Sequence, residues 1–569
     1  MPSRARRRVR ALLPRVAAAG LALACAAGAA VPGTARADTA SGGLTPEAVD
    51  AYMAEYLDST ALPGATVAVT KDGSVVHTAG YGTDSAGEPL AADTPMGLAS
   101  VSKAFTGAAV MRLVEDGRVG LDEPVRTYLP EFTTADPRSD RITVRHLLTQ
   151  TSGLSDSGFR EKSEPAPDSL KGAVARLSGV RLVADPGTEE NYHNPNYHVA
   201  ARMVEVVSGE PFADFLDDAV FTPLGMADTV TVDTAADVAA SGVADGHVAV
   251  LGVPVSLPEP ESFFNGAGGM ASTADDMAAW LAAQQNGGVG PGGGRILSAE
   301  GIEQTHTPNG TEPGETKALG WEVGRTGRGA PTIQHGGIQF TYTAEQALLP
   351  ESGYGIAVMA GSGLGRGDAV AIMAGLIALS EGAEPPAPPA AALMAVDVVL
   401  LALGALTALL GVRGLCRAAV WARRRSGSPW WGAALRCLPY VSTVFAALAV
   451  HRLSAPLAGG RDLPWIGAVY TAPTLMLFLL VAAISGAAVL VARCVHLLRG
   501  RRARRGAAAG GRAAGEPTGE PMGEPTGETR REPRSEPTGE PSGGPAGEAT
   551  EAGSTAEREP AAAPPRLTP

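Results

Sequence analysis

Apolar residues follow two different patterns along this chain, and the patterns divide it into two regions. From about Pro46 to Gly382, short apolar runs alternate with polar and glycine-rich stretches, which is typical of a mixed α/β domain. Beyond residue 391 the apolar runs become long and almost free of charge. A proline-rich stretch, residues 383–391, separates the two regions and predicts a stiff linker.

Strands are predicted at both ends of the first region, with helices between them. Ala65–Thr70 and Ser74–Ala79 flank Lys71-Asp72-Gly73, where the glycine favours the tight turn of a hairpin. The run Val101–Glu115 is apolar almost all round, which predicts a buried helix. Further helices are expected over 274–285 and 368–380, and further strands around 332–334, 341–349 and 355–359.

The second region contains three apolar segments, each long enough to cross the roughly 30 Å hydrocarbon core of a bilayer as a helix. They span about 392–412, 433–450 and 466–492. Arginines cluster after the first and the third segment, so the positive-inside rule predicts that both of these flanks, within 392–505, are cytoplasmic. The domain at 38–382 is then extracellular in a multi-pass membrane protein. Anchoring is the preferred role of the segments, and transport or scaffolding is the alternative.

The two ends of the chain predict processing and disorder. A basic run and an apolar stretch precede Ala35-Arg36-Ala37, a small-residue cleavage motif, which indicates a secretory signal peptide over residues 1–37. An uncleaved anchor and lipidation at Cys25 are the alternatives. Residues 506–569 repeat Gly-Glu-Pro-Thr and hold almost no large apolar residue, which predicts a disordered cytoplasmic tail.

Composition narrows the classes of function. The formal net charge of −13 and the pI near 5.3 argue against binding of nucleic acid, which needs a clustered basic surface. The four cysteines all lie outside residues 26–415 and the chain has no HExxH motif, so neither a metal site nor a cofactor is predicted. Lysine occurs at only five positions, and each one is therefore informative.

Ser100 and Lys103 are the first candidates for chemistry. Three-residue spacing at the start of a helix places both side chains on one face, where a lysine can serve a serine as a base. Burial among apolar residues would lower the pKa of Lys103 towards that of a working base. The backbone N–H of Ser100 is positioned to help stabilise an oxyanion. The alternative is a serine that caps the helix beside a solvated lysine.

Two further clusters hold candidate residues. Tyr192 would relay protons if nearby cations lower its pKa, and the amide of Asn194 would bind a substrate carbonyl. A tyrosine packed on the surface is the alternative. His335 precedes two glycines in a predicted strand, where glycine lets a ligand approach the backbone. A hydrogen-bonded histidine at a strand end is the alternative there.

These clusters occur in the order Ser100-Val101-Ser102-Lys103, Tyr192-His193-Asn194 and His335-Gly336-Gly337. Together they resemble the motifs of the serine β-lactamase and penicillin-binding protein superfamily. The segments 98–106, 146–154, 223–226 and 268–277 resemble the branch of class C β-lactamases, D-Ala-D-Ala carboxypeptidases and related esterases. The resemblance covers about residues 45–382 and implies an α/β (α+β) fold, with an antiparallel sheet flanked by helices plus a helical subdomain.

The resemblance also implies roles for individual residues. Ser100 would be the acylated nucleophile, Lys103 and Tyr192 would share general-base and proton-relay duties, and Asn194 would orient the substrate. His335 and Gly337 stand at the first and third positions of the family's Lys/His-Thr-Gly motif, and the backbone N–H groups of Ser100 and Ile338 would form the oxyanion hole. Gly336 replaces the threonine of that motif. Because histidine lacks a fixed positive charge near neutral pH, β-lactam hydrolysis is less expected than peptidase or esterase activity.

The sequence therefore predicts a membrane-anchored extracellular serine hydrolase that forms an acyl-enzyme on Ser100. Its substrate would be a small molecule or peptide, including cell-wall fragments: a peptide, a D-amino-acid amide or an ester. The alternative is a penicillin-binding sensor that is acylated and signals through its transmembrane helices. The membrane is the other predicted partner, and nucleic acid is not one.

Overall fold

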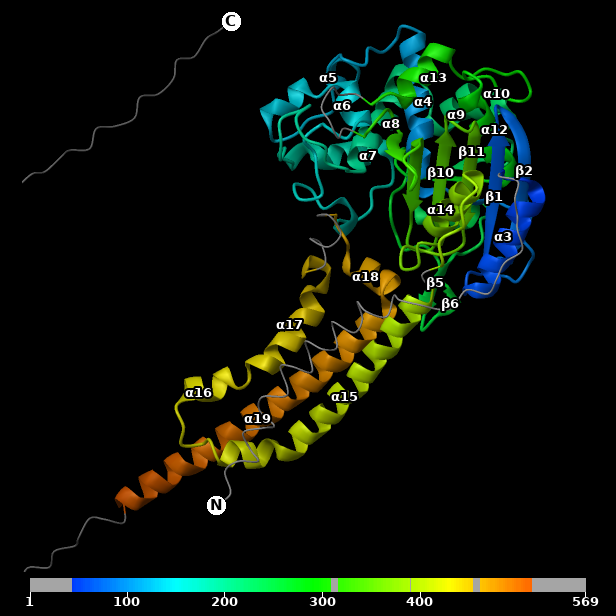
Figure 1. Ribbon diagram of the computed structural model, residues 1–569. Helices are drawn as coiled ribbons and strands as arrows, with labels where there is room; N and C mark the ends of the chain where they lie inside the picture. Colours follow the sequence, from blue (N-terminus) through cyan, green and yellow to red (C-terminus); the bar gives the residue numbers. More distant parts are fainter. Residues whose placement is uncertain (1–42, 309–315, 389, 454–460, 514–569) are drawn as a thin grey trace, which may run out of the picture. The chain divides into compact units, whose positions relative to one another are not determined.

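The computed structural model describes residues 43–308, 316–388, 390–453 and 461–513 (Figure 1). The predicted signal peptide lies outside these residues. The predicted tail does so from residue 514 onwards, while its first residues, up to Ala513, are helical.

A six-stranded antiparallel sheet forms the centre of the first region. Its strands lie in the order β2-β1-β11-β10-β9-β8. They are β1 (Gly64–Lys71), β2 (Ser74–Gly82), β8 (Glu322–Arg325), β9 (Pro331–Ile338), β10 (Thr343–Leu349) and β11 (Tyr354–Ala360). β1 and β2 are the predicted hairpin, and Asp72 and Gly73 at its turn have φ values of 50° and 78°, as a type I′ turn requires. The predicted strands near 332, 341 and 355 are β9, β10 and β11.

Helices cover both faces of this sheet (Figure 1). Side chains alternate along β1, so that Val67 and Val69 contribute to one core and Ala68 to the other. The helices α3 and α14 supply the first core, while α4 and α12 supply the second. Their bounds are α3 (Pro46–Ser59), α4 (Ser102–Glu115), α12 (Ala274–Gln285) and α14 (Asp368–Ser380), and the last two coincide with the predicted helices.

The helix α4 is the buried helix predicted over 101–115, and a short 3₁₀ turn, η1 (Ala99–Val101), precedes it. Every residue from Ser102 to Met111 is buried, because α4 packs among other helices, and its Phe105 stacks on Trp280 of α12. This placement brings the start of α4 beside β9, on which the third predicted motif lies.

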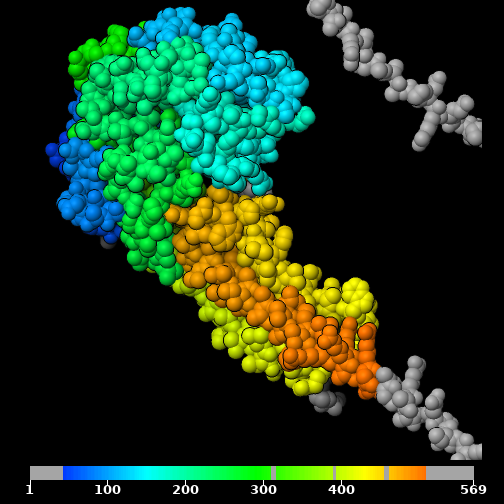
Figure 2. Space-filling model, turned by 180° about the vertical axis from the view of Figure 1, so that it is seen from behind, coloured from blue at the N-terminus to red at the C-terminus, as the bar shows by residue number. Residues whose placement is uncertain are grey.

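A helical subdomain fills the chain between α4 and α12, and its first half is the cyan part of Figure 2. Its helices are α5 (Val125–Tyr128), η2 (Pro137–Arg141), α6 (Val144–Leu148), η3 (Glu161–Ser163), α7 (Leu170–Ala175), η4 (Arg176–Gly179), α8 (Pro195–Ser208), α9 (Phe212–Leu216), η5 (Asp217–Phe221), α10 (Thr222–Leu224) and α11 (Ala235–Ala240). Two small sheets accompany them, one of β3 (Met96–Gly97), β4 (Val230–Thr231) and β7 (Met270–Ser272), the other of β5 (His247–Val250) and β6 (Val253–Ser256). The helix α13 (Ala299–His306) follows α12 and contacts α4.

The second region, residues 392–505, is called the apolar region below. Among the described residues it has two helices long enough to cross a membrane, where three were predicted. The helix α15 (Ala390–Arg423) contains the first predicted span, and α19 (Pro473–Ala513) contains most of the third. The middle segment divides into α16 (Trp430–Leu435) and α17 (Leu438–Leu453). At 1.5 Å per residue, α17 is about 24 Å long, which is shorter than the hydrocarbon core.

The third predicted span is also interrupted. Its first residues form a separate helix, α18 (Trp465–Thr471), and a proline begins α19 two residues later. Proline is well suited to the first turn of a helix, where its missing N–H has no partner to lose. The helices α15 and α19 run side by side in Figure 1, and a Cβ added to Gly411 would lie 2.8 Å from Ser485 Cβ.

Candidate active site

A cleft between the helical subdomain and β9 collects five of the seven predicted site residues. They are Ser100, Tyr192, Asn194, His335 and Ile338. The other two, Lys103 and Gly337, lie directly behind this lining: Lys103 bonds to Ser100, and Gly337 packs against Leu98. The structure thus brings together three motifs that are far apart in the sequence.

Ser100 lies in the turn η1, on a backbone held in an unusual conformation. Ala99 has a φ of 48°, which is in the left-handed region that alanine rarely adopts. Neighbouring groups fix this turn, since Ser102 Oγ donates to Ala99 O at 2.6 Å and accepts from Met270 N at 3.2 Å. Ser102, rather than Ser100, therefore secures the start of α4. Ser100 is left half-buried in the cleft wall, and the helix-capping alternative for it is wrong.

Lys103 is fully buried, and its Nζ meets three acceptors. The distances are 2.6 Å to Ala267 O, 3.0 Å to Ser100 Oγ and 3.1 Å to Asn194 Oδ1. Burial, followed by the positive charge of Arg461, holds the pKa of Lys103 well below its usual value. A neutral amine donates two hydrogen bonds and accepts one. With Ala267 O and Asn194 Oδ1 as acceptors, its lone pair is free to accept the Ser100 hydroxyl proton.

Tyr192 stands between Lys103 and the cleft. Lys103 Nζ lies 5.0 Å from the centre of its ring, and the His335 ring centre lies 6.3 Å away. Burial raises the pKa of Tyr192 to about 12, although a hydrogen bond with Ser100 and the charge of Arg461 act in the opposite direction. The condition set for a relay, that nearby cations lower this pKa, is not met in the net shift, because burial outweighs Arg461. Near neutral pH the phenol keeps its proton and can donate it.

Asn194 is the N-cap residue of α8, yet its side chain caps nothing. Its Oδ1 accepts from Lys103 instead. The segment 146–154, which carries one of the supporting motifs, holds this turn in place: Gln150 Oε1 accepts from His193 N at 2.9 Å and from Asn196 Nδ2 at 2.6 Å. That motif is therefore a support for the second predicted cluster.

His335 is buried on β9, and its Nδ1 lies 2.8 Å from Gly336 O. Burial, with help from the nearby Lys103, lowers the pKa of His335 to about 4. The ring is therefore neutral near pH 7, its Nδ1–H donates to the carbonyl, and its Nε2 is an acceptor. Pairing of β9 with β8 ends at Gln334, which leaves the edge of His335–Ile338 to face η1.

The two glycines after His335 differ in their surroundings. A Cβ on Gly337 would lie 2.2 Å from the backbone oxygen of Leu98, so only glycine lets β9 approach the serine turn this closely. A Cβ on Gly336 would meet Glu345 Oε1 at 2.5 Å, which is the end of a flexible side chain. Glu345, on β10, therefore takes the space of a larger residue at this position. Burial raises the pKa of Glu345 to about 7.

Several charged residues near the site were not predicted from the sequence, and three of them contact the second motif. Asp156 Oδ1 lies 2.7 Å from His193 Nδ1, within the second motif. Glu161 lines the cleft, 3.5 Å from Asn194 Nδ2, and Arg461 lines it from the apolar region. Asp156 lies two residues beyond the motif that ends at Leu154, which is a weak signal. Nothing in the sequence near Arg461 points to a site in another region.

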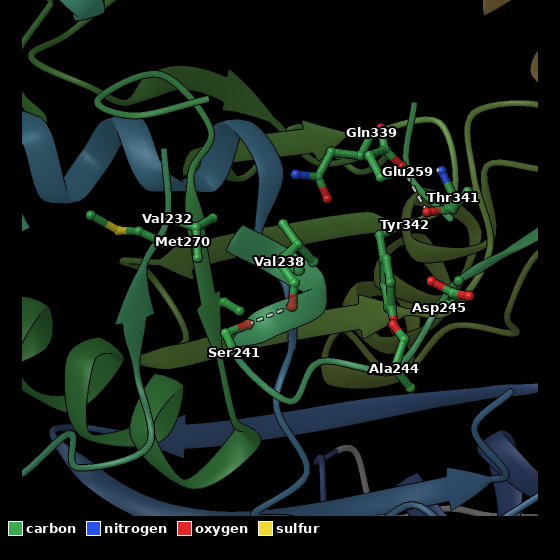
Figure 3. Close-up of a pocket in the computed structure, with 13 residues that line it drawn as sticks. Val232, Val238, Ser241, Ala244, Asp245, Glu259, Met270, Gln339, Thr341 and Tyr342 are labelled. Atoms are coloured by element: carbon green, nitrogen blue, oxygen red, sulfur yellow. Dashed lines mark hydrogen bonds between the residues drawn. The ribbon is translucent and has the colours of Figure 1, made fainter. Parts of the chain in front are cut away.

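A second, smaller pocket lies between the small sheets and the end of β9 (Figure 3). Several of its polar groups have partners, since Tyr342 Oη donates to Ala244 O at 2.7 Å and Thr341 Oγ1 donates to Glu259 Oε2 at 2.7 Å. Of the seven predicted site residues, none lines it. The described residues also contain no group of three or more metal-binding side chains.

Comparison with known proteins identifies a family. A family model described as Beta-lactamase matches residues 49–379. The chain is 30% identical over 320 residues to "Penicillin-binding protein 4" of Amycolatopsis lactamdurans, covering 53% of this chain and 82% of that protein. It is 27% identical over 318 residues to "Protein flp" of Staphylococcus aureus (strain COL), covering 55% of this chain but only 62% of that relative.

A solved structure has a similar fold. It is the octameric penicillin-binding protein homologue from Pyrococcus abyssi, with a TM-score of 0.50 and 25% identity, over 60% of this chain and 79% of that one. The match agrees with an antiparallel sheet covered by helices, the architecture that the motifs predicted.

Proposed function

The chain belongs to the Beta-lactamase family of serine hydrolases, and from that premise we propose that it is a membrane-anchored hydrolase that forms an acyl-enzyme on Ser100. The observation that carries the proposal is the environment of Lys103, a buried lysine whose Nζ lies 3.0 Å from Ser100 Oγ and whose other two partners are acceptors. This arrangement suits a neutral amine that acts as a base towards the serine.

In the proposed acylation, Ser100 Oγ attacks the carbonyl carbon of the substrate while its proton passes to Lys103 Nζ. The backbone N–H groups of Ser100 and Ile338 stabilise the oxyanion that forms. The phenol of Tyr192 donates its proton to the leaving amine or alkoxide and recovers one from Lys103. Water then attacks the acyl-serine along the same proton path in reverse, which releases the acid and restores Ser100.

The proposed substrates are peptides, D-amino-acid amides or esters, including fragments of a cell wall. The strand side of the cleft presents neutral His335 and, above pH 7, the carboxylate of Glu345. Such a wall has no fixed positive charge to bind a substrate carboxylate, which supports amide or ester hydrolysis over efficient β-lactam hydrolysis. The proposed location is the cell membrane, with the domain at 38–382 outside; a C-terminal tail inside the cell requires α17 to cross as a third span in addition to α15 and α19.

A penicillin-binding sensor uses the same acylation but releases the acyl group slowly. One observation favours it as a second candidate: residues of the apolar region line the cleft, so an acylated site contacts the membrane-associated part of the chain. The lifetime of the acyl-enzyme separates the two candidates.

The proposal is tested by intact mass spectrometry of the full chain in detergent, after incubation with a fluorescent penicillin or a p-nitrophenyl ester. We expect an adduct on Ser100 and turnover of the ester, and both should be lost in Ser100→Ala. Ser102→Ala is not a suitable control, because Ser102 supports the turn that carries Ser100. Ser157→Ala, a change of an exposed serine of the helical subdomain, is the matched control and should react like the wild type. Adducts that persist in Ser100→Ala would sink the assignment.

A further inference from the structure

The apolar region contributes residues to the wall of the active-site cleft. Arg461, Asp462, Leu463 and Thr471 all line it, and they belong to the segment that leads through α18 into α19. In Figure 2 the orange residues of this segment lie against the green residues of the first region. Tyr470 Oη donates to Pro258 O at 3.0 Å, and the Tyr470 ring packs edge-on against Phe340, with 5.9 Å between ring centres.

The contact is polar and specific at its other end. Asp156 Oδ2 accepts from Arg461 Nε at 2.6 Å and from the backbone N of Asp462 at 2.8 Å. Ser163 Oγ donates to Asp462 Oδ1 at 2.9 Å, and the Asp462 side chain is buried. Both carboxylates are buried, although Arg461 is only partly buried and Ser163 is exposed. Charge-assisted bonds of this length to buried carboxylates fix geometry more strongly than a solvated surface pair does.

Asp156 connects Arg461 to the second motif. The other carboxylate oxygen of Asp156 lies 2.7 Å from Nδ1 of His193, whose side chain is fully buried. In the sequence, His193 stands between the site residues Tyr192 and Asn194. The guanidinium of Arg461 also lies over the Tyr192 ring, 4.6 Å from its centre. Arg461 therefore contacts both the Asp156 carboxylate, which holds His193, and the ring of Tyr192.

We propose that the segment Arg461–Thr471 is a structural part of the active site and that Arg461 is a positioning residue, which holds Asp156 and His193 and thereby the Tyr192 and Asn194 side chains. The proposal rests on the proposed function and adds that the hydrolase needs its apolar region for full activity. Arg461 is already bonded to Asp156 and stacked on Tyr192, which favours positioning over direct binding of a substrate carboxylate.

The charge of Arg461 also acts on Lys103. Removal of that charge should raise the pKa of Lys103, so that the base becomes neutral, and the reaction fast, only at higher pH. The other charged or titratable groups that influence Lys103, or that it influences, are Glu161, Lys162, His198, Lys317 and His335, together with the phenols of Tyr192 and Tyr197. An Arg461 variant keeps all of these residues, and the charge of Arg461 also acts on Glu161 and Tyr192. A shift of the acidic limb of the pH profile therefore reports the loss of the Arg461 charge from this cluster.

The first test compares variants of the full chain in detergent by their rate of acylation with the fluorescent penicillin across pH. Arg461→Gln should lower the rate by about 10- to 100-fold, as expected when catalytic groups lose their alignment, and should move the acidic limb to higher pH. Arg461→Lys should restore the position of the limb but not the full rate. Arg452→Gln, which changes an exposed arginine just before the same segment, is the matched control. A rate and pH profile of Arg461→Gln that equal those of the wild type would overturn the inference.

The second test reads the contact without using activity. The native cysteines are first replaced by alanine, and Ser163→Cys and Asp462→Cys are then introduced together. The protein is oxidised in membranes, and the chain is cut at a protease site placed in residues 383–388. We expect the two fragments to stay joined until reduced, and to separate in the Ser163→Cys single variant. Separate fragments in a chain that still acylates Ser100 overturn this inference alone. Joined fragments in a chain that does not acylate Ser100 overturn the proposed function, and the inference with it.

Discussion

The two walls of the active-site cleft satisfy their polar groups in opposite ways. On the helical wall, the Nζ of the buried Lys103 bonds to three protein oxygens, which belong to Ser100, Asn194 and Ala267. On the strand wall, His335 Nδ1 bonds to the carbonyl oxygen of Gly336 on the same strand, and its Nε2 has no such partner among the described residues. Burial disfavours the charged form of Glu345 on the same wall. The comparison teaches that the proposed nucleophile and base lie together on one wall, while the other wall offers a neutral ring and the proposed oxyanion-binding N–H of Ile338.

The largest effect should come from removing the base on the helical wall. Lys103→Met keeps most of the length and volume of the side chain but has no basic amine to take the Ser100 proton, so the acylation rate should fall by about 10²- to 10⁴-fold. The measurement is stopped-flow acylation of the full chain in detergent. Lys171→Met, which changes an exposed lysine of α7, is the control. If Lys103→Met keeps its rate, the chemistry does not reside on this wall.

An intermediate effect should distinguish the two glycines of the strand wall. Gly337→Ala places a Cβ 2.2 Å from a backbone oxygen that cannot move aside, so overpacking should lower the free energy of unfolding by about 1–3 kcal/mol and slow acylation. Gly336→Ala should be tolerated, because the Glu345 side chain can rotate away. Thermal unfolding and acylation rates of both variants check this. Equal effects at the two positions would contradict the contact between β9 and the serine turn.

The smallest effect on rate, with a distinct pH signature, is expected at Glu345. Its pKa is about 7 in the folded state, above the usual 4.5, so the neutral form is favoured and stability is lost as pH rises through 7. Glu345→Gln should therefore stabilise the protein at pH 8, by at most about 3 kcal/mol, and leave it unchanged at pH 4. Melting temperatures at both pH values are the measurement, with exposed Glu351→Gln as the control. A gain at pH 4 as large as that at pH 8 would rule out a titrating Glu345.

Local patterns predicted most of the first region and the core of the site. The hairpin turn at Asp72-Gly73 and the all-apolar run that became α4 each carry their structure in neighbouring residues. Ser100 and Lys103 were found because their spacing on one helix is also local. The sequence predicted that His335 lacks a fixed positive charge, but neither the lowering of its pKa to about 4 nor the raised pKa of Tyr192 could be predicted, because both follow from burial by residues distant in the sequence.

The apolar region was predicted less well, for a reason visible in its prolines. Hydropathy favoured three spans, yet Pro439 and Pro473 each lie in the first turn of a helix, which breaks two of the predicted segments. The part cut off from the third span became α18 and joined the cleft wall. No periodicity or motif marks Arg461 as a neighbour of Tyr192, since that contact depends on tertiary packing alone.

The strand order described above also sets the order in which the molecule is completed. Ala65 on β1 pairs with Ala360 on β11, so this pairing of the first strand to be synthesised forms only after the last strand of the sheet has been synthesised. The long loop between them must be closed before this pairing stabilises anything, which makes such topologies slow to fold. The nucleophile turn is synthesised early but acquires its strand neighbour only when β9 emerges, and Arg461 arrives later still. A growing chain therefore carries Ser100 for most of its synthesis without the neighbours that would make it reactive.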